Sequence, residues 1–284
     1  MGQALPNAFQ PNLWGRRFLI VITTLFALTF LVAPLVVVLT RAFEYGWSPF
    51  WKAVTEIYTV KALRLTALTT VLAVTCNTLF GLCAAWALTR FQYKGRGFLI
   101  TLIDLPFAIS PIIAGLIFIL TYGRLGWLHP YLVDWQLRIV FNVPGVVLAT
   151  IFVTLPFVAR EIVPVLAARG TDEEQAAVLM GAGFFTVFFK VTFPHIRWAL
   201  VYSLILCAAR AMGEFGAVSV VSGHLRGKTN TLPLHIEILY NEHKFSESFA
   251  VSTILVATSV IILTARNVIE QLAKKEDESN VFRS

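Results

Sequence analysis

Two charged residues stand one helical turn apart inside a strongly apolar segment, and they are the first candidates for function. Arg210 and Glu214 lie in the stretch CAARAMGEFGAVSVVSG. A charged side chain at the centre of a bilayer costs roughly 2.5–3.5 kcal/mol, so such residues face a bundle interior or a water-filled cavity. Their spacing puts both on one helix face, where they can neutralise each other. The pattern favours an element of a transport path or gate, with an ion pair that only locks helix packing as the alternative.

Small, hydroxylated and helix-breaking residues accompany this pair. Glycines nearby permit close backbone approach. An earlier apolar run contains DLPFAISP, residues 104–111, in which two prolines and an acid interrupt the helical pattern. Such breaks are tolerated where protein or a water-filled cavity surrounds the freed backbone groups, so a packed kink and a pore lining both fit. The candidate residues of a path or gate are Arg210, Glu214, Gly213, Gly216, Ser110, Pro111, Ser219 and Ser222.

A polar stretch between two apolar runs, residues 170–194, has the pattern of an ordered element. Thr171 and Glu174 form T-x-x-E, which predicts a capping box at the start of a short helix. Residues 181–183, Gly-Ala-Gly, permit a sharp turn. Phenylalanines then follow at helical spacing, and Pro194 is expected to end this second helix. The residues themselves fit both an amphipathic helix on the membrane surface and a docking site for a partner protein.

The composition places the elements that carry these residues in a membrane. The chain has 284 residues, of which 57% are hydrophobic and 14% are charged, whereas soluble domains carry about 25% charged residues. The net charge of +7 comes from cations at the ends of apolar runs, so we expect no nucleic-acid partner. The three cysteines and five histidines are scattered. We therefore expect neither a metal site nor a catalytic centre.

Six segments are long enough to cross a hydrocarbon core, which takes roughly 20 helical residues. They are residues 18–40, 62–89, 98–122, 143–166, 198–222 and 248–269. Lys and Arg residues are modestly more frequent on the side that holds both termini and the 170–194 loop, which predicts that this side is cytoplasmic. We expect a flexible N-terminus at 1–13, a transmembrane domain at 14–272 with its cytoplasmic loop at 170–197, and a flexible tail at 273–284.

The 170–194 loop resembles a known motif. Its residues QAAVLMG, then nine residues and VTFP, are similar to the EAA loop of ABC importer permeases, whose pattern is EAA, three residues, Gly, nine residues and I-x-L-P. In that family the loop forms a coupling helix that sits in a groove of an ATP-hydrolysing subunit. The resemblance implies that the ATPase-coupling residues are Thr171, Glu173, Glu174, Gln175, Ala176, Ala177, Gly181, Gly183 and Pro194.

One residue departs from the motif. The usual Glu of the family is Gln175 here, although Glu173 and Glu174 lie just upstream. A neutral amide still accepts a hydrogen bond but loses the charge-assisted part of its strength. An ion pair at position 175 is therefore not expected.

A narrower resemblance covers residues 14–269. The blocks LIDLPFAISPIIAGLIF, VTLPFVAREIVPVL, VTFPHIRWAL and ARAMGEFGAVSVVSGHLRGKTNTLPLHIEIL look very like CysW-type permeases of bacterial sulfate/thiosulfate importers. This resemblance implies an all-α membrane protein of six helices with the type I importer permease fold. It implies a heterodimer with a CysT-type (or CysU-type) permease, two CysA-type ATP-binding subunits that use ATP and Mg, and an external sulfate- or thiosulfate-binding protein. The chain itself would be a lipid-embedded transport subunit of the bacterial inner membrane, with no cofactor of its own.

Two alternatives follow from the same residues. A molybdate/tungstate permease carries a block similar to ARAMGEFGA and would differ in cargo rather than mechanism. A secondary anion transporter without an ATPase would also have six spans and intramembrane charges, but it leaves the ordered loop without a role. Residues 223–229 fall one residue short of P-loop spacing and follow a span rather than a strand, so we expect no nucleotide site in this chain.

Overall fold

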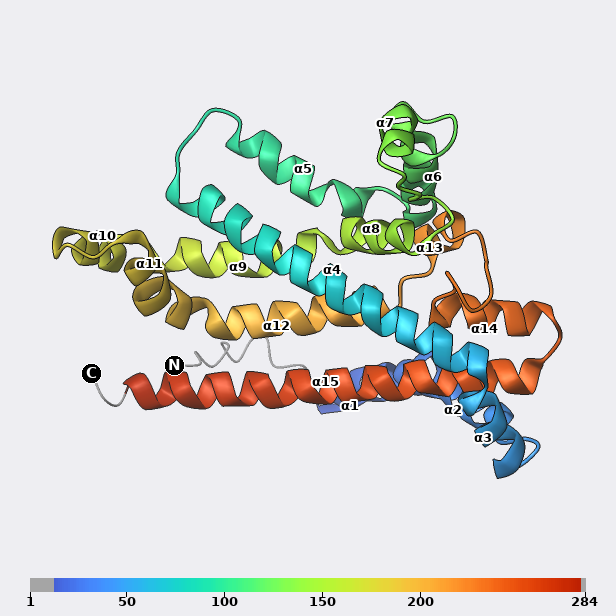
Figure 1. Ribbon diagram of the computed structural model, residues 1–284. Helices are drawn as coiled ribbons and strands as arrows, with labels where there is room; N and C mark the ends of the chain where they lie inside the picture. The colour runs from blue at the N-terminus through green and yellow to red at the C-terminus, as the bar shows by residue number, and fades with distance from the viewer. Residues whose placement is uncertain (1–12, 282–284) are drawn as a thin grey trace.

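The membrane spans of the bundle are built from helices that run through most of the chain (Figure 1). The computed structural model describes residues 13–281, with side chains described for 14–271. Within that part of the chain, five helical segments are long and apolar enough to cross a membrane, and a bent pair supplies a sixth. The five are Trp14–Ala42, Ile57–Arg90, Val143–Arg169, Phe184–Met212 and Phe245–Gln271. The prediction of six spans is thus confirmed, with changes to two of them.

The spans correspond to labelled elements as follows. The first contains α1 (Leu13–Ala27), the π-helical turn η2 (Leu28–Val32) and α2 (Ala33–Ala42), the second is α4 (Ile57–Arg90), and the fourth contains α8 (Val143–Thr154) and α9 (Pro156–Arg169). The fifth contains α11 (Phe184–Val187), η3 (Phe188–Thr192) and α12 (Phe193–Met212), and the sixth is α15 (Phe245–Val281). The shorter helices are α3 (Trp47–Thr55), α7 (His129–Asp134), α10 (Asp172–Leu179), α13 (Gly216–Val221) and α14 (Leu232–Asn241).

The third predicted span is broken rather than continuous. It consists of α5 (Arg96–Ala108) and α6 (Pro111–Tyr122), which meet at an angle of 109°. Ser110 precedes a proline, whose ring disfavours the α conformation at the residue before it, and Ser110 has the extended values φ −57° and ψ 134°. The DLPFAISP pattern therefore marks a complete break, larger than a proline kink.

The fifth span differs from its prediction at both ends. Pro194 does not end the helix of residues 184–193, because it occupies the first turn of α12, where no N–H is needed. The π-helical turn η3 joins this turn to α11. The helix then stops at Met212, so the prediction that it continues to 222 is wrong. Residues 213–215 are non-helical, and α13 is a separate short helix.

The core lies where α4, α9 and α12 pack together. Its buried residues include Ala85, Ile162, Ile196 and Cys207. Gly81 allows the closest approach of α4 to α9, because a Cβ there would lie 2.6 Å from a methyl carbon of Val158. Small residues at helix contacts let membrane helices approach closely and gain dispersion energy that lipid cannot supply.

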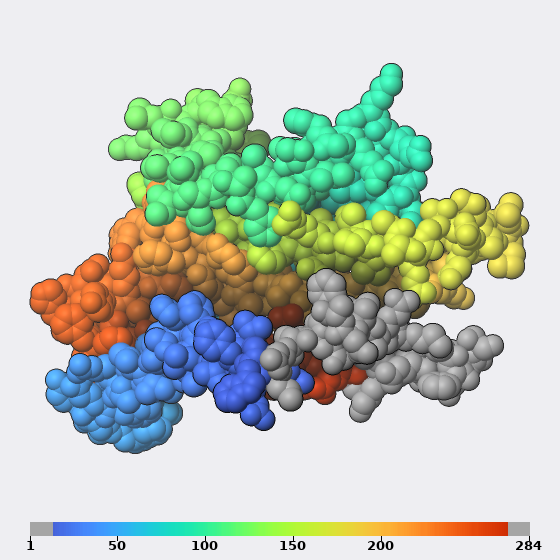
Figure 2. Space-filling model, turned by 180° about the vertical axis from the view of Figure 1, so that it is seen from behind, coloured from blue at the N-terminus to red at the C-terminus, as the bar shows by residue number. Residues whose placement is uncertain are grey.

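The two ends of the bundle differ. At one end, α10 and α11 lie beside the end of α9, and α15 ends nearby, whereas α3, α14 and the start of α15 lie at the opposite end (Figure 1). Seen from behind, the yellow segment around α10 projects beyond its neighbours (Figure 2). The tail boundary predicted at 273 falls inside α15, which continues to Val281. Residues 1–12 and 282–284 of the predicted flexible ends lie outside the described residues.

Candidate functional site

The loop of residues 170–194 forms a short helix, as predicted, but its first turn is held differently. Helix α10 spans Asp172–Leu179, and Gly181 has φ 86°, a value that glycine adopts readily and other residues do not. The predicted capping box is wrong. The Thr171 hydroxyl accepts a hydrogen bond from the Gln175 amide at 2.9 Å instead of capping the helix. Glu174 turns away from the backbone because a guanidinium offers a stronger, charge-assisted partner.

That guanidinium belongs to Arg90, the last residue of α4. Its Nε lies 2.7 Å from Glu174 Oε2, and its Nη2 donates to Glu174 Oε1 at 2.9 Å. Thr192 donates to the same Oε1 at 2.7 Å, and Arg90 Nη1 donates to the Leu166 carbonyl at 3.2 Å. The Arg90 and Glu174 side chains are only 9% and 13% exposed. One buried cluster therefore joins α10 to α4, α9 and the start of the fifth span.

A second, more exposed contact ties α10 to α12. Glu173 Oε2 lies 2.6 Å from His195 Nε2. Glu173 and Glu174 thus both bridge to neighbouring helices, while Gln175 and Ala176 stay exposed and Ala177 is buried. The sequence pattern assigned Glu174 to a cap and gave no sign of its partners Arg90 and Thr192, or of His195 beside Glu173. Arg90 carries a positive charge and His195 a ring nitrogen that can pair with a carboxylate, but only tertiary packing brings them to the loop.

Aromatic rings fix the second half of the loop and leave an apolar surface facing away from the bundle. Phe184 and Phe188 lie 5.7 and 5.6 Å from the Trp86 ring of α4. The surface left over, which we name the α10 patch, is formed by Val178, Leu179, Met180 and Phe185. Leu179 is 88% exposed. An exposed apolar patch of this kind is typical of an interaction site.

The intramembrane charges predicted to pair do so. Arg210 Nη1 lies 2.5 Å from Glu214 Oε2, and the Glu214 side chain is buried while that of Arg210 is about one third exposed. Glu214 Oε1 also accepts a hydrogen bond from the Ala217 N–H at 2.9 Å, which caps the start of α13. Glu214 therefore has two roles: one carboxylate oxygen pairs with Arg210 at the end of α12, and the other binds the first turn of α13.

The two breaks in the spans meet in space. A Cβ added to Gly216 at the start of α13 would lie 2.8 Å from Cβ of Pro111 at the start of α6. Gly115 of α6 approaches the Ala217 carbonyl equally closely, with 2.8 Å from its ideal Cβ to the oxygen. Gly213 has more room, since its nearest neighbour would be the Ala209 carbonyl oxygen at 3.7 Å. The candidates Pro111 and Gly216, from two different spans, thus belong to one region.

The three candidate serines differ in what they can reach. Ser110 is exposed at the α5–α6 break, whereas Ser219 donates to the Gly216 carbonyl at 2.8 Å. Ser222 is fully buried, and its hydroxyl accepts from the His224 N–H at 3.2 Å. Ser110 is the one of the three best placed to meet a solute.

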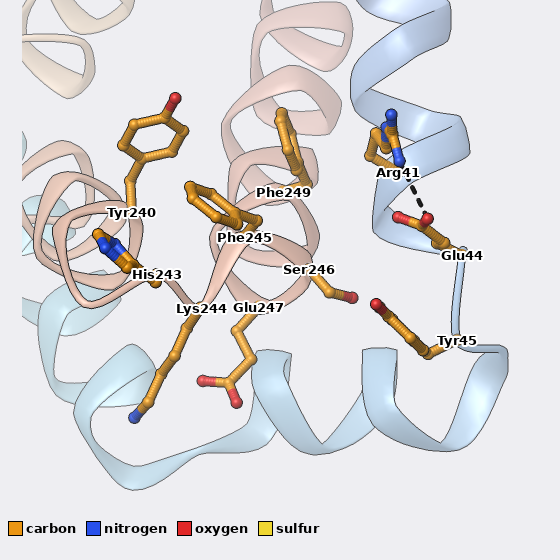
Figure 3. A pocket seen from close by; sticks show the side chains of 10 residues that line it. All are labelled: Arg41, Glu44, Tyr45, Tyr240, His243, Lys244, Phe245, Ser246, Glu247 and Phe249. Atoms are coloured by element: carbon orange, nitrogen blue, oxygen red, sulfur yellow. Dashed lines mark hydrogen bonds and ion pairs between the residues drawn. The ribbon is translucent and has the colours of Figure 1, made fainter.

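A cavity of about 530 Å³ opens at the end of the bundle opposite α10. Its lining combines both charge signs with aromatic rings, and Figure 3 shows Arg41 paired with Glu44 while Lys244 and Glu247 extend from the other wall. None of the residues predicted for the site lines this cavity. Within residues 14–271, no three His, Cys, Asp or Glu side chains lie close enough to hold a metal ion.

Helix α14, whose Tyr240 lines this cavity, also contains a buried histidine. His235 of α14 is 1% exposed, and its Nε2 lies 3.2 Å from the Thr59 hydroxyl. Burial, together with the charges of Arg226 and Lys244 and against that of Glu242, lowers the pKa of His235 to about 4. The hydrogen bond from Arg226 lowers the pKa of the exposed Glu242 carboxyl. The imidazole is therefore neutral at pH 7.

Comparison with known proteins agrees with this arrangement. Residues 77–276 match the family model of the binding-protein-dependent transport system inner membrane component. The chain is 44% identical to a sulfate transport system permease protein CysW of Synechocystis sp., over 92% of this chain and 95% of that one. It is 32% identical to a sulfate transport system permease protein CysT of Escherichia coli, over 87% and 89% of the two chains.

The fold itself has a solved counterpart. A chain in the crystal structure of a bacterial alginate ABC transporter, in complex with an alginate-bound periplasmic protein, superposes with a TM-score of 0.77 over 92% of this chain and 96% of that one. At 15% identity this likeness concerns the fold alone. The all-α, multi-pass architecture, the matched family and the CysW relatives agree. The chain belongs to the inner membrane components of binding-protein-dependent transport systems and, among them, to the CysW-type ABC importer permeases.

Proposed function

We propose that the chain is the transmembrane permease subunit of an ATP-driven importer of sulfate or thiosulfate. The proposal rests on the CysW relative, 44% identical over nearly the whole of both chains, and on the CysT relative, which is a similar but distinct permease. A heterodimer of this chain with a CysT-type permease would complete the translocation path. The exposed helix α10, tied by buried charge to α4, is the observation that carries the coupling role.

ATP would be used by partner subunits rather than by this chain. Two CysA-type subunits with ATP and Mg would bind the end of the bundle that holds α10, with the α10 patch in a groove of one of them. Both termini would then lie in the cytoplasm with the loop. The sulfate- or thiosulfate-binding protein would dock at the opposite end, where α3, α14 and the 530 Å³ cavity lie.

Transport would proceed by alternating access. Closure of the ATP-binding subunits would move α10. The Arg90–Glu174 ion pair would make α4 move with it, because both side chains are largely buried and each forms more than one hydrogen bond. Opening of the bundle would expose the region where α6 meets α13 and where Arg210 is held by Glu214. A guanidinium, a serine hydroxyl and a helix break suit a dianion better than exposed carboxylates do.

The docking role of the α10 patch has a direct test. Leu179→Asp places a charge on an 88% exposed side chain, and Leu125→Asp does the same at a 98% exposed position in the α6–α7 connection, away from α10. We expect Leu179→Asp to fold but to lose the ATPase subunit during co-purification from detergent, whereas Leu125→Asp retains it. Equal retention by both variants would contradict the docking role.

Uptake measurements test which anion the complex transports. The complex with its binding protein, reconstituted in vesicles, is expected to accumulate labelled sulfate and thiosulfate only with internal ATP. Uptake of molybdate in their place would favour the molybdate/tungstate alternative. Uptake without any ATPase subunit would instead support a secondary transporter. In the same assay, Arg210→Ala is expected to lower uptake while assembly persists, and unchanged uptake would remove Arg210 from the path.

A further inference from the structure

A second ion pair lies at membrane depth outside the region described above. Arg160 of α9 places its Nε 2.8 Å from Asp104 Oδ1 of α5, and its Nη2 lies 3.5 Å from Oδ2. The guanidinium carbon also sits 4.6 Å from the centre of the Phe107 ring. Phe107 in turn packs against Phe157, with 5.1 Å between ring centroids. The guanidinium is therefore held on one edge by a carboxylate and on one face by an anchored ring.

The pair lies well inside the span. Arg90, at the end of α4, donates to the carbonyl of Leu166, which marks the level of the α10 end of the bundle. Arg160 precedes Leu166 by six residues on the same helix, which is about 9 Å along the axis. Asp104 follows the start of α5 at Arg96 by eight residues, about 12 Å. A hydrocarbon layer of about 30 Å centred on the 27-residue span Val143–Arg169, which is about 40 Å long, would include Arg160 and its partner.

At that depth the pair is nevertheless uncovered. The side chains of Arg160 and Asp104 are 54% and 35% exposed. Charged groups inside a membrane face a bundle interior or a water-filled cavity rather than lipid. A guanidinium has five N–H donors, and a carboxylate engages at most one edge of it. Within residues 14–271 no other acceptor lies within hydrogen-bond distance of this guanidinium, so it retains donors for a further anion.

The neighbouring chain break supports an aqueous setting. Helix α5 ends at Ala108, one turn after Asp104, and the chain turns by 109° into α6. Backbone that leaves the helical state at membrane depth is tolerated where protein or a water-filled cavity surrounds it. The exposed Ser110 lies in this break. Arg160 and Asp104 thus provide a guanidinium and its counter-ion on two neighbouring helices, and Ser110 adds a hydroxyl in the break six residues after Asp104.

We propose that Arg160 contacts the transported oxyanion in the half of the translocation path nearer α10, with Asp104 and Phe107 as positioning residues. The proposal rests on the proposed function for its cargo. Asp104 stabilises Arg160 while the path is empty and weakens the hold on an arriving dianion, since the carboxylate repels it. A site on a transport path needs that balance, because the anion must leave as readily as it enters.

The test uses thiol labelling in the complete complex. Arg160→Cys is made in a chain whose exposed Cys76 and Cys83 are changed to Ala, while the buried Cys207 is kept. An anionic, membrane-impermeant methanethiosulfonate is expected to label the new thiol, and saturating sulfate with binding protein and ATP is expected to slow labelling severalfold. The matched control is Lys94→Cys, exposed in the α4–α5 connection, whose labelling should not respond to sulfate.

The second test measures sulfate uptake and ATP hydrolysis, with the sulfate-loaded binding protein at a saturating concentration. Arg160→Gln is expected to lower the amount of sulfate moved per ATP hydrolysed by about tenfold, the loss of roughly one charge-assisted hydrogen bond. Arg160→Lys should retain more of it, and Asp104→Asn should slow uptake by holding the anion longer. ATPase activity stimulated by the binding protein should persist in all three.

Two results would overturn the role of Arg160. The thiol at position 160 could resist labelling in the complex yet react in the separated chain, which would place the pair against the partner permease. Alternatively, Arg160→Gln could leave the sulfate moved per ATP unchanged. A failure of the proposed function is seen separately, in the wild-type complex: uptake of molybdate alone would change the cargo, and labelling would then be slowed by molybdate rather than sulfate.

Discussion

Glu174 of α10 and Arg90 of α4 are joined across 84 residues of sequence by an ion pair of 2.7 Å whose two side chains are almost entirely buried. A surface pair of this kind would contribute little. Here the carboxylate also accepts from Thr192 and the guanidinium also donates to Leu166. The helix that we expect to meet an ATPase subunit is thus fixed to the bundle by a charged cluster, in addition to the chain connections on either side of it.

Loss of this pair should uncouple ATP hydrolysis from transport. Glu174→Gln keeps the shape of the side chain but leaves the Arg90 charge without its counter-ion, and removal of one partner of a buried pair typically costs about 3–5 kcal/mol. We expect the sulfate moved per ATP hydrolysed to fall by about tenfold or more, measured as uptake and phosphate release in the same vesicles. Glu173→Gln is the control, because the Glu173 side chain is 65% exposed and its partner is His195. Equal coupling ratios in the two variants would refute the role of the cluster.

The contact between the two helix breaks should tolerate no added methyl group. Gly216→Ala would place a Cβ 2.8 Å from Cβ of Pro111, whose ring cannot rotate away. Overpacking of this kind typically costs about 1–3 kcal/mol, so we expect a lower melting temperature in detergent and lower uptake. Gly213→Ala is the matched control, since its nearest neighbour would lie at 3.7 Å. If both alanine variants melt like the wild type, α6 and α13 are not packed as described.

The two roles of Glu214 can be separated by two substitutions. Glu214→Gln removes the charge opposite Arg210 but keeps a carbonyl oxygen that can accept from Ala217, whereas Glu214→Ala removes both. Loss of a helix cap costs about 0.5–2 kcal/mol. Both variants should transport poorly, and the alanine variant should also unfold at a lower temperature than the glutamine variant. Identical thermal unfolding of the two would mean that the cap contributes nothing.

The buried histidine makes the stability of the chain depend on pH. His235 has a pKa of about 4 in the folded chain and an ordinary value near 6.5 when unfolded. Its stabilising contribution is therefore complete above pH 6.5, and it is lost as pH falls from 6.5 to about 4, because only the unfolded chain binds the proton there. The loss amounts to about 3 kcal/mol.

Thermal unfolding of the purified chain between pH 7.5 and pH 4.5 checks this dependence. The side chain faces the hydroxyl of Thr59 and, at 3.8 Å, the carboxylate of Glu56, while Arg226, Glu242 and Lys244 act on it through their charges. We expect His235→Gln to lower stability at pH 7.5 but to flatten the decline toward low pH. A slope as steep as that of the wild type would assign the decline to the nearby carboxylates instead.

Much of the fold could be predicted because the bilayer imposes local rules. Runs of about 20 apolar residues must be helical to satisfy their own backbone hydrogen bonds, which is why the number of spans was predicted correctly. The short helix after Gly170 was predicted from its T-x-x-E start, although the cap itself does not form. The Arg210–Glu214 pair was predicted from a spacing of one helical turn. It forms although α12 stops at Met212 and Glu214 lies in the non-helical residues 213–215.

The errors arose where a local pattern had a tertiary competitor. The T-x-x-E pattern of Thr171 and Glu174 predicts a cap, but Glu174 binds Arg90 because a buried guanidinium is a stronger partner than a backbone N–H. Pro194 is a helix breaker within a helix but not in its first turn, and its position relative to the first turn of α12 depends on the π-helical turn before it. Arg90 lies 84 residues from Glu174 in the sequence, whereas η3 directly precedes α12 but has no sequence pattern that predicts it.

By itself the sequence determined the class of the protein, the number of its spans, the EAA-like loop and the nearness of Arg210 to Glu214, since all of these follow from composition, motif or separation along the chain. Only the tertiary structure decided that Arg90 holds Glu174, that Gly216 meets Pro111, and that Arg160 and Asp104 stand together and uncovered at membrane depth. The physical reason is that these contacts join separate helices. Their formation depends on which faces pack together and on how the α5–α6 break turns the chain, and no periodicity within a single helix records either.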